Sequence, residues 1–585
     1  MKLSDYVINF LVSKDATHVF EVCGGSITHL LDSLYKRKDI RVVSMHHEQA
    51  AAFAAEGYSR SGGNIGVAMA TSGPGATNLI TGIASCFFDS IPCVFITGQV
   101  NTYEFKFKKP VRQIGFQETD IVNLVKPITK YAVLITEPDK IRYYLEKAFY
   151  IAKSGRPGPV LLDIPMNIQR AEIKPKSLES FADTTSKLCK KPSSDIIKRV
   201  INSIKSSSRP VVFIGGGLGL SKAQGELLKF IKYTEMPVVS SLMGIDGFPH
   251  DNRVFSGMIG TYGNRYANLT VANADLVLIL GARLDTRQTG TKPETFARSA
   301  NIIHVDIDQH ELNNKRKADI PINCDINYFL TLINKKMSSF DKNKIEPWRK
   351  LVNGYKKKYP SCGIFSDNKI GPNFFMSRLS RFLPEASVVC VDVGQNQMWA
   401  AQTLEIKKTQ RFLTQGGAGA MGSSLAMAIG ASFANPGKVI IAISGDGGFQ
   451  LNIQELQTIY HYKLPVKIIL LNNHCYGMVK QFQEQYFNSR FQSTVLGYSC
   501  PDFQAVASAY RIPVQKISQA SKIDISLRKL FSNKHPGFLE IDINSNIKVI
   551  PKLSVNRPVE DQEPFLSRDE LKSNMLIDIL PEDKK

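Results

Sequence analysis

Short runs of β-branched and other apolar residues alternate with longer stretches of helical periodicity along most of the chain. Uninterrupted apolar runs are typical of strands that are buried on both faces of a parallel sheet. An alanine-rich helical stretch at 49–60 lies between two of them. The runs fall at 41–45, 65–69, 93–97, 160–163, 211–214, 276–280, 302–306, 388–392, 439–443 and 466–471. The alternation predicts three doubly wound α/β domains with parallel sheets.

Polar stretches separate three blocks of this pattern. The segments 177–193 and 335–358 are predicted to be linkers. A chain of 585 residues is long enough for several domains. The expected divisions are three α/β domains at 1–175, 190–340 and 365–548, followed by a polar, proline-containing C-terminal tail at 549–585.

Composition and charge exclude several classes of protein. Hydrophobic residues make up 43% and charged residues 21%, which is ordinary for a folded globular chain. No apolar stretch is long enough to predict a membrane span, and the first twenty residues do not resemble a signal peptide. The nine cysteines are scattered without a CxxC pair, which favours a reduced, cytoplasmic protein. The net charge of +21 is spread thinly, so no nucleic-acid partner is expected.

Two predicted strand ends in the last block carry the residues of a metal–diphosphate site. Gly445, Asp446 and Gly447 follow the run at 439–443, and Asn473 follows the next run. A predicted helix at 451–462 makes the two strands neighbours, and open α/β sheets bind ligands at this edge. Carboxylate and amide oxygens suit Mg²⁺, and glycine lets the backbone approach a diphosphate. The glycine–aspartate–glycine turn alone is also typical of a plain strand–turn–helix unit. With Asn473 at this distance, it predicts a thiamine-diphosphate site.

Glu48 is the candidate acid for activating the thiamine cofactor. Thiamine requires a carboxyl group that bonds to a pyrimidine nitrogen and acts as a general acid and base. Glu48 follows the strand at 41–45 and opens the nearly uncharged helical stretch at 49–60. A first-turn glutamate also commonly complements a helix dipole, and this reading would be preferred for Glu48 alone. Together with the Gly445–Asn473 signature, the catalytic interpretation is preferred.

Four long stretches resemble the acetolactate synthase large-subunit group of thiamine-diphosphate enzymes, over about residues 1–550. They are His47–Gln49 with Thr71–Asn78, Ser154–Pro165, Asp392–Trp399 and Gly445–Tyr476. The resemblance implies that 1–175 is the pyrimidine-binding domain for thiamine diphosphate, that 190–340 is the central domain and that 365–548 is the diphosphate-binding domain. It also implies a homodimer or homotetramer with active sites between subunits. It implies that Glu48 activates the cofactor and that Gln117 faces the reacting carbon. The implied cofactor-binding residues are Thr71, Ser72, Pro74, Asn78, Gln395, Gln397, Gly419, Met421, Gly445 and Gly447, and the metal-binding residues are Asp446, Asn473 and Cys475.

The central domain resembles the FAD-binding version found in the same family. A glycine triplet after a strand marks many nucleotide-binding folds and is weak by itself. Because the synthase reaction is redox-neutral, the resemblance implies a structural role for FAD. The implied FAD-binding residues are Arg156, Gly215, Gly216, Gly217, Arg283, Asp306 and Asp325.

Other positions depart from the usual acetolactate synthase pattern. Phe482 stands where typical synthases have a tryptophan that shapes the choice of acceptor, and the segment 101–115 is longer and more basic. These departures resemble a flavoenzyme branch of cell-surface deoxysugar pathways, the yersiniose type, whose acceptor is a CDP-linked 4-ketosugar. Arg287, which in synthases binds the carboxylate of an acceptor keto acid, is retained. The acceptor therefore stays open between these two classes.

The resemblance implies a carboligase that decarboxylates pyruvate and transfers the two-carbon hydroxyethyl unit to a carbonyl acceptor. The alternative of a 2-keto acid oxidase or decarboxylase predicts peroxide or free aldehyde as the main product. A third hypothesis is a cofactor-binding protein without catalysis. If Glu48→Gln leaves pyruvate consumption unchanged, the assignment of Glu48 as the acid is wrong.

Overall fold

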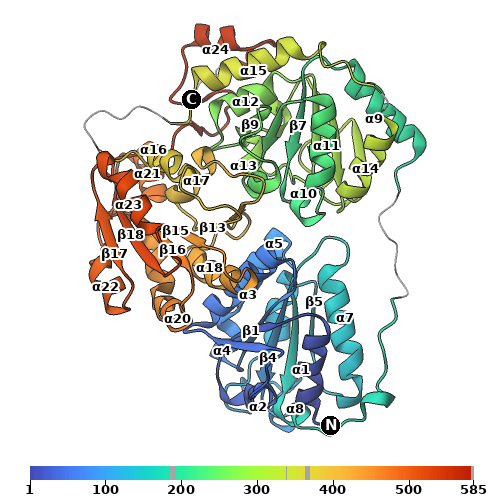
Figure 1. The fold of residues 1–585 in the computed structure, drawn as a ribbon. Helices are drawn as coiled ribbons and strands as arrows, with labels where there is room; N and C mark the ends of the chain where they lie inside the picture. Colours follow the sequence, from blue (N-terminus) through green and yellow to red (C-terminus); the bar gives the residue numbers. More distant parts are fainter. Residues whose placement is uncertain (184–190, 338, 363–368, 582–585) are drawn as a thin grey trace.

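The computed structural model describes residues 1–183, 191–337, 339–362 and 369–581. The chain forms three α/β domains, each built around a six-stranded parallel sheet with helices on both faces (Figure 1). The predicted fold class is confirmed. All ten predicted runs overlap strands. Nine of these strands are buried on both faces of their sheets, as uninterrupted apolar runs predict, whereas the strand at 41–44 lies at a sheet edge and is partly exposed. Part of the predicted linker at 177–193 and the first residues of the segment 365–548 lie outside the described residues.

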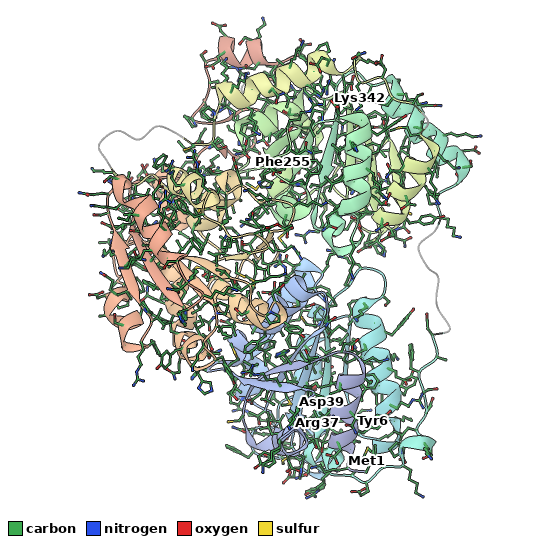
Figure 2. The ribbon with its side chains drawn as sticks, viewed as in Figure 1. Met1, Tyr6, Arg37, Asp39, Phe255 and Lys342 are labelled. Atoms are coloured by element: carbon green, nitrogen blue, oxygen red, sulfur yellow. The ribbon has the colours of Figure 1, made fainter. Side chains whose placement is uncertain are left out.

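The N-terminal sheet has the strand order β2-β1-β3-β4-β6-β5. Its strands are β1 (His18–Val22), β2 (Arg41–Ser44), β3 (Gly66–Ala70), β4 (Cys93–Gln99), β5 (Tyr131–Leu134) and β6 (Val160–Pro165). Its helices are α1 (Leu3–Ser13), α2 (Thr28–Leu34), α3 (Glu48–Gly62), α4 (Pro74–Asn78), α5 (Ile80–Asp89), α6 (Ile121–Val125), α7 (Ile141–Lys153) and α8 (Met166–Gln169). The ion pair of Arg37 and Asp39 lies at the surface of this domain (Figure 2).

The central sheet has the order β12-β11-β10-β7-β8-β9. Its strands are β7 (Pro210–Ile214), β8 (Val238–Ser240), β9 (Phe255–Met258), β10 (Leu276–Leu280), β11 (Asn301–Asp306) and β12 (Ile320–Asn323). Its helices are α9 (Ser194–Ser206), α10 (Gly216–Leu220), α11 (Gln224–Thr234), α12 (Arg265–Ala272), α13 (Thr286–Thr289), α14 (Ile326–Lys336) and α15 (Glu346–Lys358). Phe255 lies inside this domain and stacks on His250, with ring centroids 4.1 Å apart (Figure 2).

The third sheet has the order β14-β13-β15-β16-β18-β17. Its strands are β13 (Val388–Val391), β14 (Arg411–Leu413), β15 (Ile440–Gly445), β16 (Val466–Asn472), β17 (Val514–Ile517) and β18 (Gly537–Asp542). Its helices are α16 (Pro372–Ser380), α17 (Gln395–Thr403), α18 (Ser423–Ala434), α19 (Asp446–Phe449), α20 (Leu456–His461), α21 (Gly477–Tyr486), α22 (Phe503–Ala509) and α23 (Ile523–Leu530). The helix predicted at 451–462 begins as a 3-10 segment, Gln450–Glu455, and becomes α-helical only at Leu456.

The segment 335–358 is not the linker that its lysines suggested. It contains α15, which packs on α12 of the central domain through Trp348, Val352 and Tyr355. These three residues share one helical face, while the lysines occupy the solvent side. The prediction that 335–358 is a linker was wrong, because it rested on polar composition and overlooked the helical spacing of these three residues.

The C-terminal segment beyond residue 549 lies along the central domain. It contains the strand pair β19 (Lys552–Leu553) and β20 (Gln562–Glu563), followed by α24 (Arg568–Asn574). Leu553, Val559 and Leu571 are buried in the same apolar cluster as α12 and α15. This segment therefore connects the third domain to the surface of the central one.

Candidate active site

The carboxyl ends of β15 and β16 bring the predicted metal ligands together. The two strands are paired in parallel, with Gly445 opposite Leu471, so Asp446 and Asn473 follow at one edge of the sheet. One end of the Asn473 amide lies 2.9 Å from Oδ1 of Asp446 and 2.9 Å from the main-chain oxygen of Cys475. The amide nitrogen donates to Oε1 of Gln395 at 2.8 Å, so the amide oxygen faces the other two oxygens.

Three oxygen atoms that face one another without a hydrogen are mutually repulsive unless a cation lies between them. Oxygen ligands of Mg²⁺ at about 2.1 Å and at right angles lie roughly 2.9 to 3.0 Å apart. The two separations of 2.9 Å from the Asn473 amide, to Asp446 and to Cys475, therefore fit a magnesium ion. In the reverse orientation the Asn473 nitrogen would donate to both oxygens, so the orientation of the amide depends on whether a cation is bound.

A pocket of about 80 Å³ lies beside these oxygens. Gly447 needs to be glycine here, because an added Cβ would collide with the ring of Tyr476. Gln397 does not line this pocket; its side chain donates to Oγ1 of Thr414 and to the main-chain oxygen of Gln415. Gly419 also lies outside the lining and has a φ of +65°. The predicted residues that do line the pocket are Gln395, Met421, Gly445, Asp446, Gly447, Asn473 and Cys475.

The residues predicted for the pyrimidine side gather around the N-terminus of α3. The amide of Asn78 donates to Oε2 of Glu48 at 2.9 Å. Oγ of Ser26 lies 2.8 Å from Oγ1 of Thr71 and accepts from the main-chain N–H of Ser72 at 2.7 Å. Pro74 begins α4, the helix that ends at Asn78.

Gln117 belongs to the same cluster. Its backbone is left-handed, with a φ of +64°, and its side chain packs against Gly73. Glu48 is half-buried, with Gly75 and Thr71 close to its carboxylate. The cluster thus joins one carboxyl group, two amides and three hydroxyl groups at one edge of the N-terminal sheet.

The N-terminal and third domains contact each other within one chain through α3 and α18. An added Cβ at Gly57 or Gly430 would collide with the main chain of the opposite helix, so the two helices approach closely. Near the N-terminus of α3, Asn452 donates to the side chain of Gln49 at 3.3 Å and to the main-chain oxygen of Gly422 at 2.8 Å. Glu48 therefore lies at the same end of this helix pair as Met421, which lines the small pocket.

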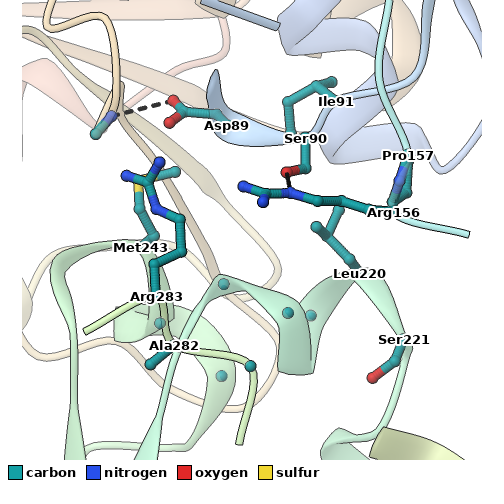
Figure 3. A pocket seen from close by; sticks show the side chains of 18 of the residues that line it. Asp89, Ser90, Ile91, Arg156, Pro157, Leu220, Ser221, Met243, Ala282 and Arg283 are labelled. Atoms are coloured by element: carbon teal, nitrogen blue, oxygen red, sulfur yellow. Dashed lines mark hydrogen bonds between the residues drawn. The ribbon is translucent and has the colours of Figure 1, made fainter. Parts of the chain in front are cut away.

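A cavity of about 1820 Å³ lies where the three domains meet (Figure 3). Arg156 bonds to Oγ of Ser90 at 2.8 Å and to Glu311 at 2.7 Å, and Arg283 bonds to Asp285. Burial raises the pKa of Asp306, at the end of β11, to about 6. All seven predicted FAD-binding residues line this cavity: Arg156, Gly215, Gly216, Gly217, Arg283, Asp306 and Asp325.

The two predicted substrate residues lie in different places. Arg287 also lines the three-domain cavity, whereas Phe482 does not and packs on Tyr486 of α21 instead.

Comparison with known proteins decides the family. Residues 1–124 match the N-terminal TPP (thiamine pyrophosphate) binding domain of thiamine pyrophosphate enzymes, 197–333 match the central domain, and 392–541 match the C-terminal TPP binding domain. Acetolactate synthase 1, chloroplastic, of Zea mays is 36% identical over 569 residues, covering 94% of this chain and 87% of the relative. The acetolactate synthase large subunit of Cyanidium caldarium is 36% identical over 547 residues, covering 92% of each chain.

The chain belongs to the acetolactate synthase family of thiamine pyrophosphate enzymes. The predicted resemblance and the predicted enzyme class, a thiamine pyrophosphate-dependent carboligase of the acetolactate synthase type, are confirmed. Among the described residues, no helix is long and apolar enough to cross a membrane.

Tyr498 contacts a predicted metal ligand, and the sequence did not reveal this contact. Its hydroxyl group donates to Oδ2 of Asp446 at 2.6 Å. Burial raises the pKa of Tyr498, and the nearby Asp446 carboxylate adds to this effect, so the phenol keeps its proton. Tyr498 lies in the loop after α21 and belongs to none of the recognised motifs, so only the fold brings it to Asp446.

Proposed function

We propose that this family member binds thiamine diphosphate through Mg²⁺ at Asp446, Asn473 and the Cys475 carbonyl, and uses pyruvate as its donor. The proposal is carried by the Asn473 amide, one end of which lies 2.9 Å from both Oδ1 of Asp446 and the main-chain oxygen of Cys475. The diphosphate would lie beside Gly445 and Gly447, in the pocket that Met421 lines. Bound thiamine diphosphate supplies the carbanion chemistry of the reaction.

In this proposal the residues of the chain orient the cofactor and move a proton. Glu48 holds and returns a proton at the pyrimidine ring, as a general acid and base. Asn78 fixes the Glu48 carboxylate through the 2.9 Å hydrogen bond. Gln117, on Gly73, would orient the substrate near the reacting carbon. Gln397 would act indirectly, by supporting the chain that leads to Met421, because its side chain donates to Thr414 and Gln415. Gly419 would offer its main chain to the aminopyrimidine.

We also propose that the large cavity binds FAD in a structural role. The cavity offers arginines for a dinucleotide's phosphates, and acidic groups such as Asp306 and Asp325 for its hydroxyl groups. Oγ of Ser241 is buried in the cavity wall without a hydrogen-bond partner among the described residues, which fits a polar ligand. Purified protein should therefore carry a yellow chromophore.

The first acceptor that we propose is a 2-keto acid. Arg287 favours it, because its side chain is exposed to the three-domain cavity and can bind a carboxylate. We further propose a cytoplasmic homodimer or homotetramer, on the family resemblance and the scattered cysteines described above.

A CDP-linked 4-ketosugar is the second candidate acceptor. The buried Glu118 carboxylate accepts from the main-chain N–H of Lys106 at 2.8 Å and of Ile114 at 2.7 Å, and so folds the basic segment into a compact loop. Lys108, Lys109 and Arg112 are exposed on this loop, near Gln117. A cluster of cations beside the proposed site suits a diphosphate-bearing acceptor.

Product analysis distinguishes these candidates. The purified enzyme, with thiamine diphosphate and Mg²⁺, would be given pyruvate alone and with 2-ketobutyrate, simple ketones or a CDP-4-ketosugar. Acetolactate or its 2-ketobutyrate analogue as the dominant product supports the keto-acid acceptor, and a branched sugar supports the ketosugar. Peroxide or free acetaldehyde as the main product would contradict both and support an oxidase or a decarboxylase.

A further inference from the structure

One short segment of the third domain touches both proposed cofactor sites. It runs from Thr414, after β14, to Gly422, before α18. Gly416 lines the three-domain cavity, and Met421 lines the diphosphate pocket. We call residues 414–422 the connecting segment. Only four residues separate Gly416, at the cavity, from Met421, at the proposed thiamine site.

Asp89, the last residue of α5, holds the connecting segment from the N-terminal domain. Its Oδ2 accepts from the main-chain N–H of Gly416 at 3.0 Å, and its Oδ1 accepts from that of Gly417 at 2.8 Å. The side chain is buried in the cavity wall, and Arg283 extends toward it from the central domain (Figure 3). A carboxylate that accepts two successive N–H groups fixes the position of that peptide.

Met243 of the central domain packs against the same residue, Gly416. An added Cβ at Gly416 would press against Sδ of Met243 and would lie 3.5 Å from Oδ1 of Asp89. Met243 also lines the cavity (Figure 3). Gly416 is therefore enclosed between two side chains that a ligand in the cavity would contact or confine.

Further hydrogen bonds carry this restraint along the connecting segment. Oε1 of Gln415 accepts from Oγ of Ser85 at 3.1 Å and from the main-chain N–H of Ala420 at 3.2 Å. Gly422 donates to the Asp392 carboxylate at 2.9 Å. Because close-packed interiors transmit small displacements, the position of Gly416 is expected to influence that of Met421.

We propose that Asp89 is a positioning residue that couples the two cofactor sites. A flavin dinucleotide in the cavity confines Asp89 and Met243 against Gly416, and this restraint holds Met421 ready for thiamine diphosphate. The inference rests on the proposed function, because it requires that both cofactors bind where they are assigned. Coupling of binding is reciprocal, so each cofactor should tighten the binding of the other by the same factor.

The test measures binding and not activity. Protein freed of cofactors would be titrated with thiamine diphosphate in excess Mg²⁺, with and without saturating FAD. Trp399 lines the diphosphate pocket, so its fluorescence can report binding. We expect FAD to lower the Kd for thiamine diphosphate roughly 10-fold in the unaltered protein. The ratio to compare is the Kd for thiamine diphosphate without FAD divided by the Kd with FAD. In Asp89→Asn this ratio should fall to about 1 to 2, while each cofactor still binds alone.

Asp275→Asn is the matched control. Asp275 also accepts from two successive main-chain N–H groups, those of Ser208 and Arg209, both at 2.9 Å, but lies within the central domain. This variant should keep the ratio of the unaltered protein. If Asp89→Asn does not fold, as judged by circular dichroism, Ser85→Ala loosens Gln415 instead and should lower the ratio.

The outcomes separate the coupling from the proposed function. A ratio near 1 in the unaltered protein, or an unchanged ratio in the foldable Asp89→Asn or Ser85→Ala variant, overturns the coupling. Failure of the unaltered protein to bind thiamine diphosphate or FAD by itself would contradict the proposed function instead.

Discussion

The phenol of Tyr498 donates a 2.6 Å hydrogen bond to Oδ2 of Asp446, the carboxylate whose other oxygen faces the proposed metal position. This bond leaves Oδ1 as the oxygen for the cation and fixes its direction. A hydrogen bond to a charged group contributes roughly 1.5 to 3 kcal/mol, and partners that orient metal ligands commonly change metal affinity about 10- to 100-fold.

Tyr498→Phe should therefore weaken Mg²⁺ binding by about 10-fold or more. The expected result is a higher Mg²⁺ concentration for half-maximal activity, at saturating thiamine diphosphate and pyruvate. Tyr328→Phe, an exposed tyrosine of the central domain, is the control and should leave the Mg²⁺ dependence unchanged. An unaltered Mg²⁺ titration in Tyr498→Phe would show that Asp446 does not bind the ion through this geometry.

Glu48→Gln should reduce pyruvate consumption by about 100-fold or more, because an amide cannot exchange a proton with the pyrimidine ring. Thiamine diphosphate should still bind, since Gln can accept the hydrogen bond from Asn78. Glu137→Gln, an exposed acid of the same domain, serves as the control. Full activity of Glu48→Gln, measured as pyruvate loss with bound cofactor, would exclude Glu48 as the acid.

The meeting of Asp446 and Asn473 could be predicted from sequence, because residues that follow adjacent parallel strands meet at one edge of a sheet. Tyr498 could not, because a long loop with no recognisable motif brings it back to Asp446. The contacts of the Gln397 side chain could not be predicted either. Periodicity places it on α17, but only the fold shows that its amide bonds to Thr414 and Gln415 inside the domain.

The central strands of the three sheets were easier to predict than the short edge strands and the surface helices. Buried strands such as β10 and β16 are recognisable as apolar runs, whereas the three-residue strand β14 is too short and begins with an arginine. The half-buried edge strand β5 is a short apolar run that the prediction did not include. Helix α15 was missed because its basic surface outweighs three apolar residues in composition, although their spacing is helical. Overall composition is therefore a poor guide to a helix that is buried along one narrow face only.

The pH dependence of stability should contain a contribution from Asp163 of β6. Burial raises the pKa of this carboxyl from 3.8 to about 7, although Thr97 and Gln99 donate hydrogen bonds to it. Between these values the folded state keeps a proton that the unfolded state has lost. Stability from this group therefore falls as the pH rises from about 4 to about 7 and then levels off.

Asp163→Asn cannot ionise and should lose this contribution. The Tm of the variant minus that of the unaltered protein should rise between about pH 4 and pH 7 and then stay constant. Asp139→Asn, in an exposed turn of the same domain, should instead follow the unaltered protein in parallel. A Tm difference for Asp163→Asn that does not change with pH would mean that Asp163 is ionised throughout this range.

Phe482→Trp tests whether α21 determines which acceptor the enzyme uses. Phe482 is 48% exposed, and its ring lies 4.7 Å from that of Tyr486, with the ammonium of Lys552 over both rings. A larger indole ring at this position should occupy space on the exposed side and hinder bulky acceptors. We expect kcat/KM for a ketosugar acceptor to fall about 10-fold relative to that for 2-ketobutyrate, with little change in pyruvate consumption, since pocket contacts act through differences between acceptors. Phe487→Trp, which enlarges a neighbouring exposed ring, is the control. Equal effects on both acceptors, or the same shift from Phe487→Trp, would place acceptor selection elsewhere in the site.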